Sequence, residues 1–173
     1  MTASSANQGQ LAQPKGGILP TPTDASILAA ALAFRAALDA IDRVHWERIY
    51  IDRFPRGACG HCAELLALYL QQGFGITADY VCKEFYDAQG NRETSHAWLE
   101  WDGLIIDISG DQFGWPPVIV TRQSNLHAHG EEDLRHPFNL DPVWWGQQCA
   151  GIWAEAQQHL QSASNGALQK RPG

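Results

Sequence analysis

The sequence predicts an α+β fold in which helices come first, antiparallel strands follow and a further helix closes the domain. Two observations support this order. Apolar residues recur every three or four positions in the first part of the chain, as is typical of amphipathic helices. Between 76 and 121, short segments of strand-like composition alternate with turn sequences instead. Because the two patterns are segregated along the chain, we expect helices packed on an antiparallel sheet.

Three helices are expected. The first begins near Asp24, a suitable N-cap, and its apolar stripe comprises Ile27, Ala30, Ala31, Phe34, Leu38 and Ile41. The second covers about 60–72, where Gly73 is a natural C-terminal stop. The last begins at Asp141-Pro142, with proline at its first helical position.

Four strands are expected, at 76–85, 94–101, 104–108 and 118–121. Asp102-Gly103 is a strong signal for a two-residue hairpin between the second and third strands. A two-residue turn at this point pairs Glu100 with Ile105. The pairing register of the site-bearing strands can therefore be predicted by counting.

The chain has 173 residues and 45% of them are hydrophobic, which is enough for a core and suits one domain. We place that domain at 23–161. The flanking segments 1–22 and 162–173 are rich in small and polar residues, so we expect both to be disordered.

The charge and the cysteines restrict the partners and the compartment. The formal net charge of −7 disfavours binding to nucleic acid or to an anionic membrane, both of which attract basic surfaces. The sequence has no apolar run long enough to span a membrane and no secretory signal at its start. We therefore expect a cytoplasmic protein whose four cysteines are reduced, with export by a signal-independent route left open.

Cys59 is the first candidate functional residue. It follows a loop that contains Gly57 and begins the second expected helix. The N-terminus of a helix favours a thiolate and presents free N–H groups that can hold an oxyanion. A cysteine on an apolar helix is more often a packing residue, so Cys59 needs partners to count as a nucleophile.

His96 and Asp107 supply such partners. Alternation along the strand puts His96 and Trp98 on one face, and the hairpin register places Trp98 opposite Asp107. His96 then lies diagonal to Asp107, within reach of its carboxylate. A carboxylate there would fix the imidazole tautomer, as a nucleophile–base pair requires.

Three motifs in this order resemble the transglutaminase-like branch of the papain-like cysteine enzymes, over residues 54–113. They are Gly57-Ala58-Cys59, Ser95-His96-Ala97-Trp98 and Ile105-Ile106-Asp107. The stretch from Asp107 to Phe113 also resembles small bacterial and phage members. The resemblance implies a nucleophile Cys59, a base His96 and an orienting Asp107 on a helix packed against an antiparallel sheet. It also implies acyl transfer from a protein, peptide or small amide, with no metal or cofactor.

The substrate contacts and the acyl acceptor are less constrained. We expect Trp98, Gln112 and Trp115 to line the substrate groove, although tryptophans at such positions more often belong to the core. The chain lacks the extra domains and the calcium loop of larger transglutaminases. Whether water or an amine accepts the acyl group therefore stays open, as does activity itself, since an inactive binding module could share the fold.

Two other interpretations use the same residues. Cys59-Gly60-His61-Cys62 matches the redox motif of protein disulfide isomerases, but a strand meander follows it in place of alternating strands and helices. Metal binding has candidate ligands too, but their spacing is not that of a structural zinc site. These candidates are Cys59, His61, Cys62, Cys82, His96, His127, His129 and His136. We expect His127 and His129 to be solvated in a polar loop.

Overall fold

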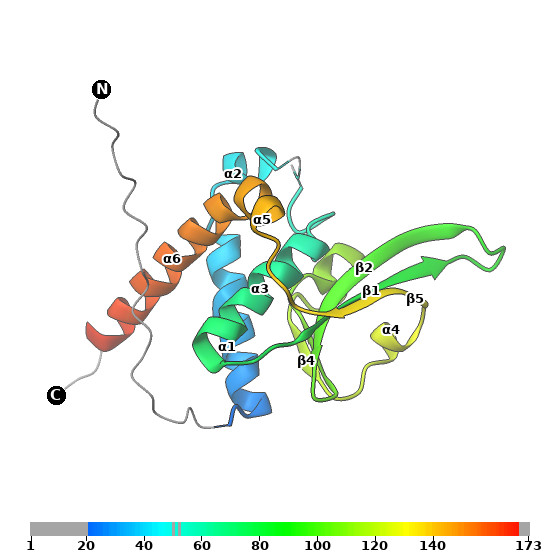
Figure 1. Ribbon diagram of the computed structural model, residues 1–173, viewed down its shortest axis with the longest axis horizontal. Coiled ribbons are helices and arrows are strands. Elements are labelled where there is room, and N and C mark those ends of the chain that lie inside the picture. Colours follow the sequence, from blue (N-terminus) through cyan, green and yellow to red (C-terminus); the bar gives the residue numbers. More distant parts are fainter. Residues whose placement is uncertain (1–20, 50, 52, 170–173) are drawn as a thin grey trace.

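The computed structural model describes residues 21–49, 51 and 53–169, and it confirms the α+β class (Figure 1). The expected disorder of 1–22 falls almost entirely outside the described residues. The helices are α1 (Asp24–Asp39), α2 (Arg43–Glu47), α3 (Cys59–Phe74), α4 (Asn125–Ala128), α5 (Pro142–Gln148) and α6 (Ala150–Gln169), with a 3-10 turn, η1 (Gly110–Phe113). The strands are β1 (Asp79–Tyr86), β2 (Arg92–Trp101), β3 (Leu104–Asp107), β4 (Ile119–Thr121) and β5 (Glu131–Pro137).

The five strands form one antiparallel sheet in the order β4-β3-β2-β1-β5. The predicted hairpin is confirmed, because Glu100 pairs with Ile105 and Trp101 with Leu104. Asp102 and Gly103 have φ angles of 48° and 71°, as a tight turn of this kind requires. Pairing between β2 and β3 stops at Leu99. The first half of β2 therefore has no described strand partner on its β3 side.

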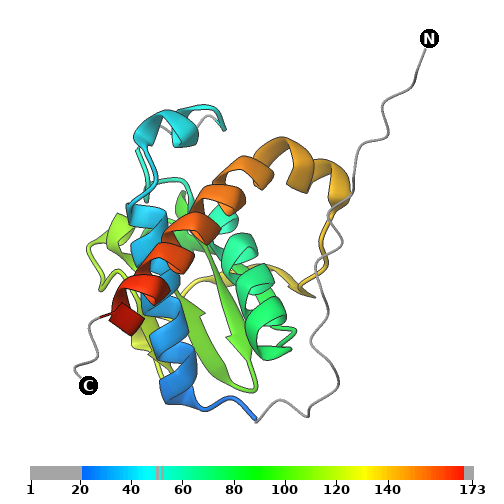
Figure 2. The same ribbon diagram turned by 90° about the vertical axis from the view of Figure 1, so that its left-hand side faces the viewer.

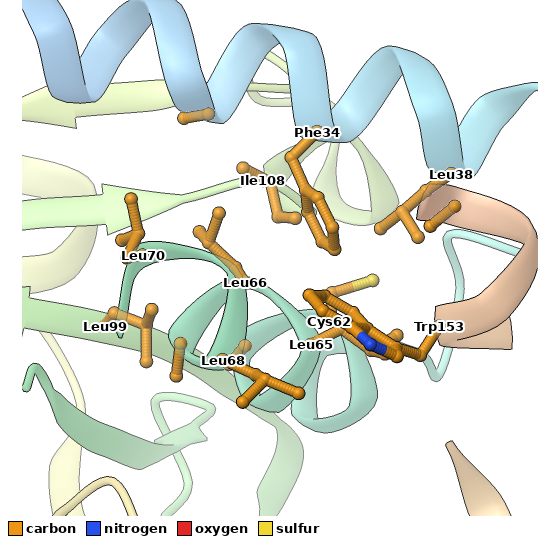
Figure 3. Close-up of a cluster of buried hydrophobic side chains, with 14 of the residues drawn as sticks. Phe34, Leu38, Cys62, Leu65, Leu66, Leu68, Leu70, Leu99, Ile108 and Trp153 are labelled. Atoms are coloured by element: carbon orange, nitrogen blue, oxygen red, sulfur yellow. The ribbon is translucent and has the colours of Figure 1, made fainter. Parts of the chain in front are cut away.

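Helices α1 and α3 pack against the sheet, and α6 packs on the outer side of α1 (Figure 2). Amphipathic helix faces and alternate sheet residues meet in one apolar core. Figure 3 shows part of this core, where Phe34 of α1, Cys62 of α3 and Trp153 of α6 lie close together. The rings of Phe34 and Trp153 have centroids 6.0 Å apart. The core fixes α3 against β2, which determines where Cys59 lies.

Element ends differ from the expectations where a neighbouring residue makes a better cap. Thr23, and not Asp24, is the N-cap of α1, because its hydroxyl accepts from the N–H of Ser26 and Ser26 reciprocates. Helix α3 continues past Gly73 to Phe74 and ends at Gly75, which adopts the left-handed conformation with φ of 67°. Sequence patterns locate elements better than they locate their ends.

The segment from 162 onward also differs from the expected disordered tail, because α6 continues through it to Gln169. The helix is already nucleated by its packed half, and extension adds one backbone hydrogen bond per residue. Ser164 donates from its hydroxyl to the carbonyl of Leu160 at 2.9 Å, within this part. Residues 170–173 lie outside the described part.

Within the described part of the chain, no helix combines the length and the apolar composition needed to cross a membrane.

Candidate active site

Cys59 is the first residue of α3. The chain reaches it through Gly57, whose φ of 73° suits glycine. The helix N-cap, Ala58, makes no side-chain hydrogen bond, so no cap side chain occupies the N–H groups of the first turn. Cys59 therefore lies at the positive end of a sixteen-residue helix whose first turn has no side-chain cap.

His96 and Asp107 meet as the register predicts. Nε2 of His96 donates to Oδ2 of Asp107 at 2.8 Å, and both side chains are fully buried. Oδ1 of Asp107 accepts from the N–H and the hydroxyl of Ser109, at 2.8 Å and 3.3 Å. Gly110 follows at a close approach, since a Cβ there would lie 2.6 Å from the carbonyl of Pro116. The carboxylate is thus held from both oxygens.

The Cys59 thiol interacts with the His96 imidazole, with the backbone N–H of Ala97 and with the Gln112 side chain. Burial alone would raise the pKa of this thiol, but the hydrogen bond and charge of His96 outweigh it, and the pKa lies below its ordinary value. Burial alone would lower the pKa of His96, yet hydrogen bonds to Asp107 and Cys59 raise it to about 9. Both directions favour a thiolate–imidazolium pair.

The pKa of Asp107 is lowered. Burial would raise it, but hydrogen bonds from His127, His96 and the N–H of Ser109 stabilise the carboxylate and hold the pKa well below its ordinary value. Asp107 is therefore ionised beside His96 at neutral pH. It can orient the ring and stabilise its positive form.

Gln112 connects the loop before Cys59 to His96. In the neutral form of His96, Nε2 of Gln112 donates to Nδ1 of the ring at 3.1 Å and to the carbonyl of Ser109 at 3.1 Å. Its Oε1 accepts weakly from the N–H of Gly57 at 3.4 Å. The side chain is only partly buried. Gln112 therefore lies beside both Cys59 and His96 and is partly open to solvent.

The two tryptophans expected in the groove differ in position. The ring of Trp115 is partly exposed and lies edge-on to the His96 ring, with centroids 5.5 Å apart. Trp98 is only 1% exposed, donates to Glu100 at 3.1 Å and packs against His127 at 4.8 Å. Its expected role as a substrate contact is therefore not supported by this arrangement, because His127 of α4 covers the Trp98 ring.

Arg35 is a supporting residue that the sequence analysis missed. It lies on α1 and is 6% exposed. Its guanidinium binds both oxygens of Asp111, at 2.7 Å and 2.8 Å, and donates to the carbonyl of Ile108 at 2.7 Å. These contacts hold η1, which carries Gln112, against α1. Asp111, the next acidic residue after Asp107 in the sequence, is occupied by this ion pair.

Arg35→Met should lower the free energy of unfolding by about 3 kcal/mol. This is the low end for a broken buried ion pair, because Asp111 is 30% exposed at its side chain and can be rehydrated. Urea unfolding of the wild type and the variant measures this loss of stability. The matched control is Asp39→Asn, which breaks a half-exposed pair of the same arginine and should cost no more than about 0.5 kcal/mol. Equal losses in the two variants would contradict the assigned role of Arg35.

His127 was expected in a solvated loop, but it is 2% exposed. Its Nε2 lies 3.2 Å from Oδ2 of Asp107 and its Nδ1 lies 2.7 Å from the hydroxyl of Ser124. Ser124 is the N-cap of α4, and β5 follows where no strand was expected. His129, its neighbour in the sequence, is exposed as expected. A Ser-x-x-His cap was the only signal in the sequence for this burial.

The positions of these side chains bear on the metal-binding and redox interpretations. Ligand atoms of His96, Asp107 and His127 lie within 4.8 Å of one another. Hydrogen bonds among them account for this closeness without an ion. Cys62 is fully buried in the core, and burial raises the pKa of its thiol, which disfavours it as a resolving cysteine.

No family model, curated protein or solved structure matches this chain.

Proposed function

We propose that this protein is a cysteine-dependent acyl-transfer enzyme of the transglutaminase-like, papain-like kind. The observation that carries the proposal is the position of His96 between an ionised Asp107 on one ring nitrogen and Cys59 on the other side of the ring. The substrate class is an amide in a protein, a peptide or a small molecule, such as a peptide bond or a glutamine side chain.

The acylation step begins with the Cys59 thiolate, which attacks the carbonyl carbon. The oxyanion that forms accepts hydrogen bonds from backbone N–H groups at the start of α3. When Nδ1 of His96 carries a proton, it can no longer accept a hydrogen bond from Nε2 of Gln112. The Gln112 amide is then free to donate to the oxyanion as well. The imidazolium then gives its Nδ1 proton to the leaving amine, and the C–N bond breaks to leave a thioester.

The deacylation step returns the enzyme to its starting form. Neutral His96 takes a proton from water or from a second amine, which attacks the thioester carbon and releases Cys59 as a thiolate. Water gives hydrolysis or deamidation, and an amine gives transamidation. The same triad can perform both outcomes, so the acceptor is decided by the partly exposed surface that includes Gln112 and Trp115.

Iodoacetamide labelling tests the proposal without a known substrate. At pH 6 we expect Cys59 to be alkylated well ahead of the other cysteines, since only a thiolate attacks. Cys149 is an internal control, because burial raises its pKa to about 12. His96→Ala should slow the labelling of Cys59 by removing the imidazolium. Labelling that is slow at Cys59, or indifferent to His96, would overturn the proposal.

The rate of acyl-enzyme formation with p-nitrophenyl acetate should follow a bell-shaped pH profile. The acidic limb is thiolate formation and lies below the ordinary thiol pKa, because the pKa of Cys59 is lowered. The alkaline limb is deprotonation of His96 near pH 9, where its pKa lies. Both charged groups are present only between these limbs. A stopped-flow pH series measures this, and an acidic limb above pH 8.5, about that of a free thiol, would contradict the ion pair.

A further inference from the structure

Two histidines approach the same carboxylate oxygen. Nε2 of His96 lies 2.8 Å from Oδ2 of Asp107, and Nε2 of His127 lies 3.2 Å from the same atom. The three side chains are 0%, 1% and 2% exposed, so water does not substitute for any of these contacts. An ionised carboxylate oxygen only accepts hydrogen bonds, so both nitrogens must carry a proton.

Ser124 fixes the proton of His127 on the required nitrogen. Its hydroxyl lies 2.7 Å from Nδ1 of His127 and can donate to it, which leaves the ring proton on Nε2. The same hydroxyl oxygen accepts from the N–H of His127 at 3.3 Å, as an N-cap does. The cap of α4 therefore also selects the tautomer of a buried histidine.

The position of α4 is fixed by contacts from the sheet. Lys83 of β1 donates from Nζ to the carbonyl of His127 at 2.9 Å. The ring of Trp98 packs edge-on against the His127 ring, with centroids 4.8 Å apart. A four-residue helix is too short to be rigid alone, but this one is held at its critical residue.

We propose that His127 is a positioning residue of the active site, which shares Oδ2 of Asp107 with His96 and thereby sets how strongly the carboxylate holds the imidazolium. The proposal rests on the proposed function, since it acts through His96. His127 contributes one hydrogen bond to the carboxylate and disperses part of its charge. Without that bond, Asp107 attracts the His96 proton more strongly.

A buried histidine that merely packs would not change the titration of its neighbour. The titratable groups that face His96 are Cys59 from α3, Asp107 from β3, His127 from α4 and Lys83, its pairing partner on β1, whose ammonium group lies on the His127 carbonyl. Removing the donor of His127 leaves Cys59 and Asp107 in place, and the carboxylate then gains charge density at Oδ2. His96 should consequently stay protonated to a higher pH, and it should give up its proton less readily to a leaving amine.

The test follows the His96 Cε1–H signal by NMR across pH in two matched variants. His127→Phe fills the space but removes the donor. His127→Gln keeps an N–H donor near the position of Nε2. We expect the His96 midpoint to rise by at least about half a pH unit in His127→Phe, an effect of the size produced by losing one hydrogen bond to a carboxylate. In His127→Gln it should return to the wild-type value.

Each outcome decides the proposal. A folded His127→Phe with a wild-type midpoint overturns it, whatever its thermal stability. If His127→Phe does not fold, Ser124→Ala decides instead: a smaller rise in the His96 midpoint supports the proposal, and no change overturns it. The proposed function fails separately, if Cys59 alkylation at pH 6 does not depend on His96. Alkylation that depends on His96, together with an unchanged midpoint in His127→Phe, removes only the role of His127.

Discussion

Cys59→Ser is expected to abolish acyl-enzyme formation with p-nitrophenyl acetate, whereas Cys62→Ala is expected to retain most of it. Loss of a triad nucleophile costs on the order of 10⁶-fold in turnover, and a serine hydroxyl at Cys59 would not ionise at neutral pH. Cys62 lies one helical turn away in the core, where it contacts apolar side chains (Figure 3). Its truncation should cost about 1 kcal/mol of stability and little activity.

The same pair of variants separates acyl transfer from redox chemistry. A thiol–disulfide oxidoreductase needs both cysteines, one to attack and one to resolve the mixed disulfide. Insulin reduction with dithiothreitol is therefore measured on the wild type and on Cys62→Ala. Strong reduction by the wild type that disappears in Cys62→Ala would sink the acyl-transfer proposal, as would full ester activity in Cys59→Ser.

The sequence contains the information that brings His96 to Asp107, because that information is local. Asp102-Gly103 determines a two-residue turn, and the turn determines the register of the strands on either side. The pairing of β2 with β3 ends at Leu99 and Ile106. Trp98 and Asp107, which counting places opposite each other, are therefore not part of the ladder. The diagonal contact survives because it needs only the direction of the two strands, not further pairing.

Arg35 and His127 could not be placed from the sequence, because their partners are distant. Arg35 is 76 residues from Asp111, and its place next to the apolar stripe of α1 gives no sign of an ion pair. His127 is 20 residues from Asp107, and the polar residues around it in the sequence predict a loop. Strand β5, which has exposed acidic side chains, lacks the apolar alternation of a half-buried strand. Tertiary contacts alone determine these positions.

Trp98 and Trp115 show that strand alternation predicts the face on which a side chain lies but not its exposure. Alternation correctly puts Trp98 on the face of His96, and their rings lie 5.6 Å apart. Alternation does not say whether that face is open, and here α4 covers it with His127. Trp115, which follows a turn, stays partly exposed at the edge of the His96 ring. Sharing a face with His96 therefore does not make a side chain accessible to solvent.

Asp107→Asn is expected to reduce acyl-enzyme formation by about 10⁴-fold while the protein stays folded. The asparagine oxygen can still accept from the N–H of Ser109, which turns the amide NH₂ toward the two histidines. Nε2 of His96 then faces a donor, so its ring must move the proton to Nδ1. A ring protonated at Nδ1 cannot take the thiol proton of Cys59.

Asp111→Asn is the matched control. Its carboxylate binds Arg35 and not His96, so this change should lower stability but leave most of the ester activity per folded molecule. Activity of Asp107→Asn near that of the wild type, with loss in Asp111→Asn, would transfer the orienting role to Asp111.

Alkylation of Asp107→Asn across pH then identifies the cause of its defect. At pH 6 iodoacetamide should label Cys59 slowly, because the imidazolium is no longer stabilised. Above about pH 9 a thiol ionises without help, and labelling should approach the wild-type rate. A defect that persists at high pH would mean that the site has collapsed, whereas convergence means that Asp107 acts through the charge and tautomer of His96.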